Sequence, residues 1–370
     1  MGGRPSSAIP RITRRATSWR GSSALGALGD IVHAIPVAAA LRRAFPSARI
    51  DWLVSAKHRE ILDLVPVIDR RLVVDDRGSA TGGRSLVETV RELRRERYDV
   101  AIDLQGLLKS AVIARLSHAR RVIGFSAKYA RESLARFFYT DVHDPGGDGM
   151  YADSEKRHVV EINLGLLTPL GLAQQTPEFP LDKPDSAAAR AAVEESGGRY
   201  VLLNPGAAWP NKRWPAARFG QLASALHERR GLTSVVLWGP GERIFADEVV
   251  ATASGAARIS RQTSIADVVA LARGAMAMVS GDTGPTHIAA ALETPLVGIY
   301  GPTRPERNGP WRADDETVSR AAVCQCHHLR RCQATEWCLL DIGVPEVLSA
   351  VERRLTARDA RLKAGEPNGV

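Results

Sequence analysis

The sequence predicts an α/β protein built from two consecutive βα domains. The chain has 370 residues, too many for one ordinary core and about right for two. Apolar strand-like runs alternate with helical patterns over residues 26–140 and again after residue 198. Such alternation favours a parallel sheet covered by helices. Glycine-rich turns follow several of the strand-like runs, as expected where such sheets bind ligands.

The first domain is expected over residues 21–175. Short apolar runs predict buried strands, and helical spacing of apolar residues separates them. The strands are expected at residues 49–54, 71–76 and 98–104, and the helical patterns at residues 41–45, 58–65 and 85–98. A loop rich in Gly, Asp and Pro follows over residues 141–158, and then a helix over residues 159–172.

The second domain is expected over residues 176–370, because a loose stretch over residues 171–198 interrupts the pattern. The alternation of strands and helices then restarts. The strands, each running into a turn, are expected within residues 200–206, 234–242, 275–284 and 295–302, and the helices at residues 217–231, 264–274, 285–294 and 345–365.

The charge of the chain favours an anionic partner. Fifty Lys and Arg residues against 41 Asp and Glu give a formal net charge of +9, which suits a phosphate-bearing substrate, a membrane surface or a nucleic acid. Part of the excess lies in residues 1–20, which we expect to be a disordered basic tail. That tail lacks the apolar segment of a signal peptide, and no apolar run reaches the ~18 residues of a membrane helix. A cytoplasmic protein is therefore expected, with attachment to a membrane surface as a further possibility.

The glycine-rich turns fall where each predicted strand ends. Doubly wound sheets bind ligands at the carboxyl ends of their strands, so the two domains are expected to hold a ligand across a cleft at these ends. The glycines concerned are Gly26, Gly29, Gly106, Gly206, Gly239, Gly241, Gly281 and Gly284.

The segment "SGDTGPTHIAAAL", residues 280–292, predicts an anion site at the start of a helix. Gly284 lets the backbone approach a ligand closely, and the first turn of the helix offers N–H groups and a favourable dipole. Asp282 and Thr283 add polar side chains, and His287 lies on the first turn. The alternative is a capped helix without any ligand, since these residues also favour turns.

The segment "NPGAAWPNKRWP", residues 204–215, places Lys212 in the turn after a strand. A lysine there is suited to bind a diphosphate, whereas Arg213 is equally well explained as a solvated charge. The turn "LWGPGE" adds Glu242, which is placed to bind ribose hydroxyls or a base amine.

The segment "GALGDIVHAIP", residues 26–36, puts Asp30 behind a glycine turn at the start of a helix. Two interpretations are open, a helix cap and a catalytic base aimed into the cleft. They are compatible, because a helix N-terminus also favours the ionised carboxylate.

Six motifs together resemble glycosyltransferase family 9, the bacterial heptosyltransferases of lipopolysaccharide inner-core synthesis. The motifs occur in order along residues 24–355, and "LGDIVH" and "GDTGPTH" are the most specific. They are "SALGALGDIVHAIP", "DLQGLLKSA", "RRVIGF", "NPGAAWPNKRWP", "SGDTGPTHIAAAL" and "GIYGPT". The resemblance implies a GT-B fold, that is, two Rossmann-like domains facing across a cleft. It also implies an ADP-heptose donor in the C-terminal domain, and transfer with inversion to a Kdo-bearing lipid A acceptor at the N-terminal domain.

The resemblance also implies roles for individual residues. Asp30 would be the general base, with His33 one turn along to orient the acceptor or tune the base. Lys212 would neutralise the leaving diphosphate. The donor-binding residues would be Lys212, Glu242, Thr263, Asp282, Thr283, Gly284 and His287. Family members often carry hydroxyl residues where this chain has Ala207 and Ala208, so phosphate contacts from those two side chains are not expected.

An anionic, lipid-linked saccharide acceptor calls for a basic surface on the N-terminal domain. We expect this surface to be formed by Arg59, Lys109, Arg120, Arg121, Lys128 and Arg131. The enzyme would work at the inner face of the cytoplasmic membrane. The family implies no metal or other cofactor in the chemistry. One departure concerns the stretch "RRATSWRGSSA", which is polar where the family has an apolar first strand.

Four cysteines gather near the end of the chain, at positions 324, 326, 332 and 338. The pattern C-x-C-x5-C-x5-C can supply four zinc ligands, although it is not the spacing of a standard ribbon or finger. The alternative, which we prefer for a cytoplasmic chain, is a set of reduced thiols packed in a loop. No metal is therefore assigned, and Cys324, Cys326, Cys332 and Cys338 are kept as candidate zinc ligands.

Other classes of protein fit the sequence less well. "GALGD" is not the G-x-G-x-x-G of a nicotinamide-dependent oxidoreductase, and no nucleic-acid-binding module is recognisable. Two alternatives stay open, a GT-B transferase that uses another nucleotide sugar and a non-catalytic sugar-nucleotide-binding module. Asp30 argues against the second.

Overall fold

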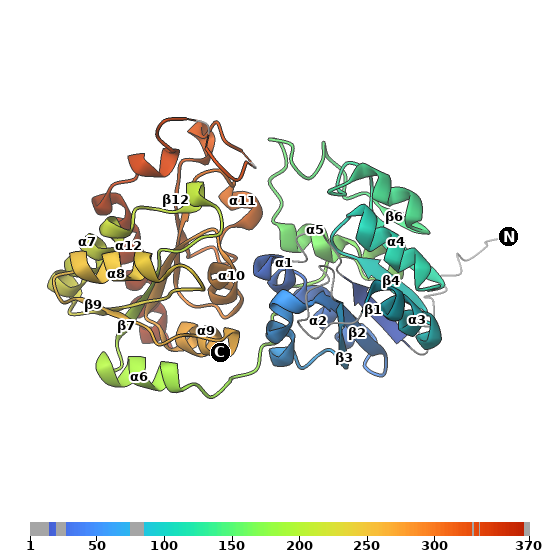
Figure 1. Cartoon of the computed structure of the whole chain (residues 1–370), viewed down its shortest axis with the longest axis horizontal. Helices are drawn as coiled ribbons and strands as arrows, with labels where there is room; N and C mark the ends of the chain where they lie inside the picture. The colour runs from blue at the N-terminus through green and yellow to red at the C-terminus, as the bar shows by residue number, and fades with distance from the viewer. Residues whose placement is uncertain (1–14, 20–26, 75–84, 328, 333, 366–370) are drawn as a thin grey trace. The chain divides into compact units, whose positions relative to one another are not determined.

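The structure is a computed structural model that describes residues 15–19, 27–74, 85–327, 329–332 and 334–365. The chain divides into two compact units, Met1–Pro180 and Leu181–Val370. They run from blue to green and from yellow-green to red in Figure 1. The sequence predicts the boundary at residues 175/176. Each unit is an α/β layer structure.

In the described part of unit 1, six parallel strands form one sheet. Their order is β3-β2-β1-β4-β5-β6, which is the doubly wound order in which strand succession reverses between β1 and β4. We call such a reversal the switch point. The strands are β1 (Arg15–Trp19), β2 (Arg49–Ser55), β3 (Arg70–Val74), β4 (Val100–Asp103), β5 (Arg121–Phe125) and β6 (Asp141–His143).

Strand β1 corrects the prediction of a disordered tail over residues 1–20. Residues 15–19 of that tail form the strand, which pairs with β2 and β4 on its two sides. The segment "RATSW" has few β-branched residues, so its strand conformation follows from ladders on both sides rather than from intrinsic propensity. Residues 1–14 and residue 20 lie outside the described residues.

The helices of unit 1 connect these strands. Helix α3 begins with a capping box in which Ser85 and Glu88 satisfy each other's backbone N–H groups. Helix α2 buries its first seven residues and so covers the sheet. The helices are α1 (Leu28–Val32), α2 (Ile35–Ala44), α3 (Leu86–Glu96), α4 (Leu108–Leu116) and α5 (Val159–Gly165), with 3-10 turns η1 (Ala56–Leu64), η2 (Ser133–Phe138) and η3 (Thr168–Leu170).

Unit 2 repeats the same architecture. Its described strands are all parallel and follow the order β12-β11-β10-β7-β8-β9, so the switch point lies between β7 and β10. The strands are β7 (Tyr200–Asn204), β8 (Thr233–Val236), β9 (Ala257–Ile259), β10 (Ala277–Gly281), β11 (Leu296–Tyr300) and β12 (Glu316–Ser319).

Helices cover both faces of the second sheet, and α12 closes the unit at its carboxyl end. The core on the side of α7 and α12 is centred on Trp214, which is 2 % exposed and donates its indole N–H to the carbonyl of Ile342. The helices are α6 (Ala187–Glu195), α7 (Ala216–Arg230), α8 (Arg243–Thr252), α9 (Ile265–Gly274), α10 (Gly284–Ala291), α11 (Pro305–Asn308) and α12 (Val344–Lys363), with 3-10 turns η4 (Pro210–Lys212), η5 (Ala321–Val323) and η6 (Cys338–Asp341).

The fold-class prediction of two Rossmann-like domains is confirmed. Most predicted strands and helices are present, although the helix expected at residues 58–65 is the 3-10 turn η1, and residues 75–76 lie outside the described residues. The elements that the sequence did not predict are β1, β5, β6, β9, β12, α4, α8 and α11. Among the described residues, none of the helices is both long enough and apolar enough to cross a bilayer.

Gly220 in α7 is expected to resist substitution. A Cβ at this position would lie 2.5 Å from the carbonyl oxygen of Val249 and would overlap the hydroxyl of Thr252 in α8. We expect Gly220→Ala to lower the free energy of unfolding by about 1–3 kcal/mol, although alanine is the better helix former. Urea unfolding measures this, and a more stable variant would contradict close packing of α7 on α8.

Candidate active site

A buried charge cluster lies at the switch point of unit 2. Lys212 follows β7, and Asp282 follows β10, the adjacent strand. The Lys212 ammonium lies 2.5 Å from one carboxylate oxygen of Asp282, and Nε2 of His287 lies 3.1 Å from the other. The side chains of Asp282 and Lys212 are 4 % and 14 % exposed. Three of the predicted donor-binding residues therefore lie together in one site.

The Asp282 carboxylate is held in its ionised form. Burial alone would raise its pKa, but the charge of Lys212 and then the hydrogen bond and charge of His287 outweigh burial, so the pKa is lowered. Lys212 also lies 4.4 Å from the centre of the Trp209 ring. The lysine is thus fixed by a carboxylate and an aromatic face, with its cationic head at the carboxyl edge of the sheet.

The remaining polar groups of this turn bond mainly to one another. The Asn204 amide donates to the hydroxyls of Ser280 and Thr283, at 2.9 Å each, and Thr283 lies 2.9 Å from the hydroxyl of Thr286. This network fixes the start of α10, whose first residue is Gly284. The hydroxyl of Thr283, predicted as a phosphate contact, is therefore also part of the support beneath the helix.

Glu242 joins two turns of unit 2. Its carboxylate accepts a hydrogen bond of 3.1 Å from the backbone N–H of Gly239, and a Cβ at Gly206 would overlap it. Thr263 is half-buried and precedes the N-cap residue of α9, Ser264. Both of these predicted donor-binding residues follow strands at the carboxyl edge, and Glu242 has a structural role there as well.

The backbone of Gly281 lies close to that of Lys212, and this contact positions the loop that carries the lysine. A Cβ at Gly281 would come within 2.8 Å of the Lys212 carbonyl, so only glycine allows this closeness. Arg213 donates to the carbonyl of Ala207 at 2.7 Å and lies 4.7 Å from the Phe245 ring centre. Arg213 therefore supports the loop and is not simply a solvated charge.

In unit 1, Asp30 forms an ion pair with Arg131. Nη2 of Arg131 lies 2.8 Å from Oδ1 of Asp30, and the two side chains are 32 % and 25 % exposed. Asp30 lies in the first turn of α1 and Arg131 in the loop after β5. The Asp30 charge, which outweighs burial, raises the pKa of Arg131. The sequence assigned both residues to the site but did not predict that they pair.

His33 ends α1 and is buried. Its ring packs edge-on against the ring of His158, with 5.4 Å between the ring centres, and its carbonyl accepts a 3.1 Å hydrogen bond from Asn163. His33 thus connects the Asp30 turn to the start of α5. Asp30 itself is in the first turn of α1, whose N-cap residue is Ala27.

A second buried carboxylate, Asp103, fixes the turn that follows β4. It accepts hydrogen bonds from the backbone N–H of Gln105 and from the hydroxyls of Ser110 and Tyr139, at 2.7–2.9 Å. Burial raises the pKa of Asp103, although these hydrogen bonds oppose the shift. The motif "DLQGLLKSA" contains Asp103, but the sequence alone did not indicate that this carboxylate holds the turn together.

Two of the six residues predicted to form the acceptor surface lie apart from the other four. Arg120 and Arg121 stand at the amino end of β5, and Arg121 pairs with Asp141 at 2.5 Å. In a parallel sheet that end lies at the edge opposite to the Asp30 turn. The four other members follow the carboxyl ends of strands, and they are Arg59, Lys109, Lys128 and Arg131.

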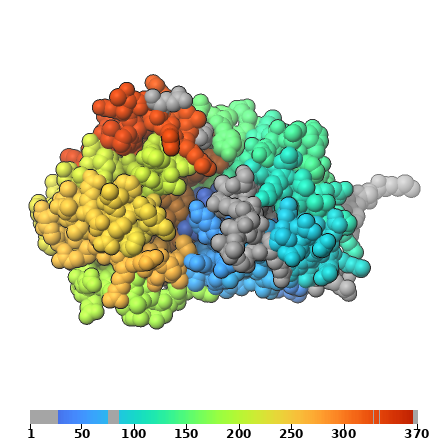
Figure 2. Space-filling view, viewed as in Figure 1, coloured from blue at the N-terminus to red at the C-terminus, as the bar shows by residue number. Residues whose placement is uncertain are grey.

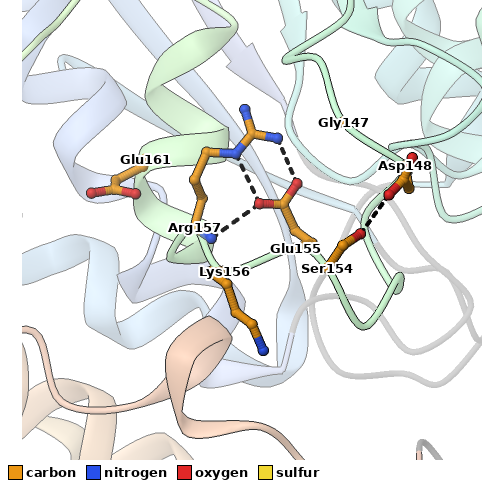
Figure 3. A pocket seen from close by; sticks show the side chains of 7 residues that line it. All are labelled: Gly147, Asp148, Ser154, Glu155, Lys156, Arg157 and Glu161. Carbon is orange, nitrogen blue, oxygen red and sulfur yellow. Dashed lines mark hydrogen bonds and ion pairs between the residues drawn. The ribbon is translucent and has the colours of Figure 1, made fainter.

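A hollow of about 420 Å³ lies in the loop after β6. Figure 3 shows the Arg157 guanidinium against the Glu155 carboxylate, with Lys156 extending the other way. Glu155 accepts 2.5 and 2.8 Å hydrogen bonds from Arg157 and a further one from the hydroxyl of Tyr129. The sequence predicted only a loop here. The lining residues are Gly147, Asp148, Ser154, Glu155, Lys156, Arg157 and Glu161.

The cysteine segment differs from the prediction of reduced thiols. Cys326 and Cys332 form a disulfide, which is possible because their Cα atoms are only 5.4 Å apart. Cys324 is buried, and burial together with a hydrogen bond to Cys324 raises the pKa of Cys338 to about 12. Within the described ranges, no three His, Cys, Asp or Glu side chains are gathered so that they could hold a metal ion. The segment is orange-red in Figure 2 and forms part of the surface.

The ion pair of Glu155 with Arg157 is expected to make a pH-dependent contribution to the free energy of unfolding. Hydrogen bonds from Arg157, opposed by burial, lower its pKa from 4.5 to about 2. Its contribution is therefore fully present above about pH 4.5 and is lost as the pH falls towards 2. We expect Glu155→Gln to lower the free energy of unfolding by up to about 3 kcal/mol at pH 7 and by progressively less below pH 4.5.

Urea unfolding at several pH values measures this effect. Glu178→Gln is a matched control, because Glu178 forms an exposed ion pair with Arg43 that is expected to contribute less than 1 kcal/mol. If the loss of unfolding free energy in Glu155→Gln, relative to the wild type, stays constant down to pH 3, the expectation is contradicted.

Lys212→Met is expected to destabilise unit 2. It leaves the Asp282 carboxylate buried without its cationic partner, which costs about 3–5 kcal/mol. The double variant Lys212→Met/Asp282→Asn should lose less unfolding free energy than the two single variants together, because it leaves no unpaired charge in the site. A double-mutant cycle at pH 7 measures the coupling, and additive losses would show that the pair does not act as a unit.

Comparison with known proteins shows what the chain is similar to. Residues 86–338 match the model of glycosyltransferase family 9 (heptosyltransferase). Lipopolysaccharide heptosyltransferase 1 of Pseudomonas aeruginosa is 32% identical over 294 residues, which are 77% of this chain and 79% of the relative. Lipopolysaccharide heptosyltransferase 1 of Escherichia coli K12 is 27% identical over 301 residues, 80% of this chain and 91% of the relative.

Solved structures share the fold. E. coli heptosyltransferase WaaC with ADP superimposes with a TM-score of 0.68 at 22% identity, covering 92% of this chain and 98% of that one. E. coli ADP-heptose lps heptosyltransferase II gives a TM-score of 0.70 at 21% identity, covering 93% and 99%. The fold is therefore GT-B, and the chain is a glycosyltransferase that belongs to glycosyltransferase family 9 (heptosyltransferase).

Proposed function

We propose that the chain transfers heptose from ADP-L-glycero-D-manno-heptose to a lipopolysaccharide inner-core acceptor, Kdo-lipid A or its heptosylated form. The observation that carries the proposal is the 32% identity with a lipopolysaccharide heptosyltransferase over most of both chains. The related WaaC structures hold ADP or ADP-2-deoxy-2-fluoro heptose, which supports a donor of this class.

The charge cluster in unit 2 supports a role in donor binding. Asp282 and Trp209 fix the Lys212 ammonium, so the cation is already oriented before a diphosphate arrives. A lysine held in this way neutralises the charge that develops on the leaving diphosphate as the bond to the sugar breaks. Thr283, Gly284 and His287 belong to the same turn, whereas Glu242 and Thr263 are assigned to the nucleoside.

In unit 1, Asp30 is proposed as the general base. The acceptor hydroxyl gives its proton to the Asp30 carboxylate as its oxygen bonds to the anomeric carbon, and ADP departs from the opposite face. The configuration at that carbon is inverted in this single displacement. A carboxylate is suited to this step when it is ionised at the working pH and within hydrogen-bond reach of the hydroxyl.

The acceptor is an anionic saccharide on a lipid, so we propose that the enzyme works on the inner face of the cytoplasmic membrane as a peripheral protein. The formal net charge of +9 supports attraction to an anionic surface. Arg59, Lys109, Lys128 and Arg131 are the assigned acceptor contacts.

Turnover by Asp30→Asn tests the proposal. With ADP-heptose and Kdo-lipid A, we expect kcat to fall about 100-fold or more, while the Kd for ADP stays within about twofold of the wild type. Asp141→Asn is the matched control, because Asp141 is also a carboxylate paired with an arginine, 24 % exposed against 25 % for Asp30.

The other outcomes are informative. Wild-type protein that binds ADP but never turns over would point to another sugar or acceptor, or to a non-catalytic binding module. Normal turnover by Asp30→Asn would show that Asp30 is not the base.

A further inference from the structure

The backbone around Arg131 is tied to both neighbouring turns of unit 1. The N–H of Ala130 donates to the carbonyl of Ser126 at 2.8 Å, and the N–H of Glu132 donates to the carbonyl of Gly106 at 2.9 Å. The Glu132 carboxylate in turn accepts a 2.6 Å hydrogen bond from the N–H of Leu108, the first residue of α4. The segment that carries Arg131 is therefore anchored within the loop after β5 and also to the turn after β4.

Gly106 makes this arrangement possible. Its φ of +65° is unfavourable for other residues, and a Cβ there would lie 2.8 Å from Cα of Ala130 and 3.1 Å from the N atom of Arg131. The glycine lets the Arg131 loop lie directly against the end of β4. The guanidinium then reaches the Asp30 carboxylate of α1 at 2.8 Å.

We propose that Arg131 is the positioning residue of the base Asp30: its guanidinium fixes the orientation of the carboxylate and offsets its negative charge. This inference rests on the proposed role of Asp30 as base. A planar guanidinium on a short, anchored loop restricts the rotation of a carboxylate more than an ammonium does. Arg131 therefore acts on the reaction through Asp30.

Other charged and titratable groups surround the pair. Asp103 and Tyr151 act on Arg131 and, like Asp30, raise its pKa. His33 ends α1 and packs against His158. The turn η1, which packs against α1, carries Lys57, His58 and Arg59. Arg131 contacts the carboxylate directly, at 2.8 Å, so removing it should change the setting of Asp30.

The pH dependence of turnover tests the inference. Without the guanidinium the carboxylate is protonated more easily, so we expect the acid limb of the kcat profile of Arg131→Met to move up by about one pH unit. Below the acid limb this shift alone should lower kcat by up to about tenfold, and at pH 8.5 only the smaller loss from misorientation of the carboxylate should remain. Arg131→Lys should recover part of the loss and serves as a second variant if Arg131→Met does not fold. ADP binding by each variant reports folding.

A matched control is Arg71→Met, because Arg71 is 31 % exposed and pairs with Asp63 in the same unit. Its profile should equal that of the wild type. The double variant Asp30→Asn/Arg131→Met should be no slower than Asp30→Asn, because a residue that acts through Asp30 has no effect once the carboxylate is gone.

Two results would overturn the inference. A raised KM for the acceptor with an unmoved acid limb would leave Arg131 with its assigned acceptor contact alone and with no effect on Asp30. If Arg131→Met leaves kcat and its pH dependence unchanged, the ion pair has no role in the reaction. Failure of the proposed function is distinct, since it appears as normal turnover by Asp30→Asn, whatever Arg131→Met does.

Discussion

Parallel pairing of the central strands is the constraint on which the functional geometry depends. Because β1 pairs in parallel with β2 and β4, and β7 with β8 and β10, all turns after these strands emerge at one edge of each sheet. At each switch point the connections that follow two adjacent strands run to opposite faces of the sheet. This opens a space at the edge of the sheet for side chains from both turns. Asp30 in unit 1 and the pair of Lys212 and Asp282 in unit 2 follow strands that border these points.

Charge compensation differs between the two units. In unit 2 a carboxylate 4 % exposed pairs with one lysine and lies within hydrogen-bond distance of one histidine, so its charge is a fixed part of the unit. In unit 1 the pair of Asp30 and Arg131 is a quarter to a third exposed. Solvent reaches this pair, so a further polar group can approach the carboxylate while the arginine holds it. The buried pair suits electrostatic support, and the exposed pair suits proton transfer.

The sequence predicted the architecture and the residues at the carboxyl edges, because strand–helix alternation and glycine turns are local patterns. It did not predict β1, whose conformation comes from two neighbours that lie far away in the chain. It also placed Arg120 and Arg121 on the acceptor surface, because composition does not tell which end of a strand a residue occupies. The pairing of Arg131 with Asp30 spans 101 positions and depends on the close approach at Gly106, which leaves no periodic pattern in the sequence.

The contact of Glu242 with two turns has a consequence for ligand binding. Its carboxylate holds the Gly239 turn and fills the space that a side chain at Gly206 would need. The turns after β7 and β8 therefore pack closely on each other through Glu242 before any ligand arrives. A nucleotide that binds at this edge does not have to order these loops, so less conformational entropy is lost on association. Preorganisation of this kind improves affinity without adding a single contact to the ligand.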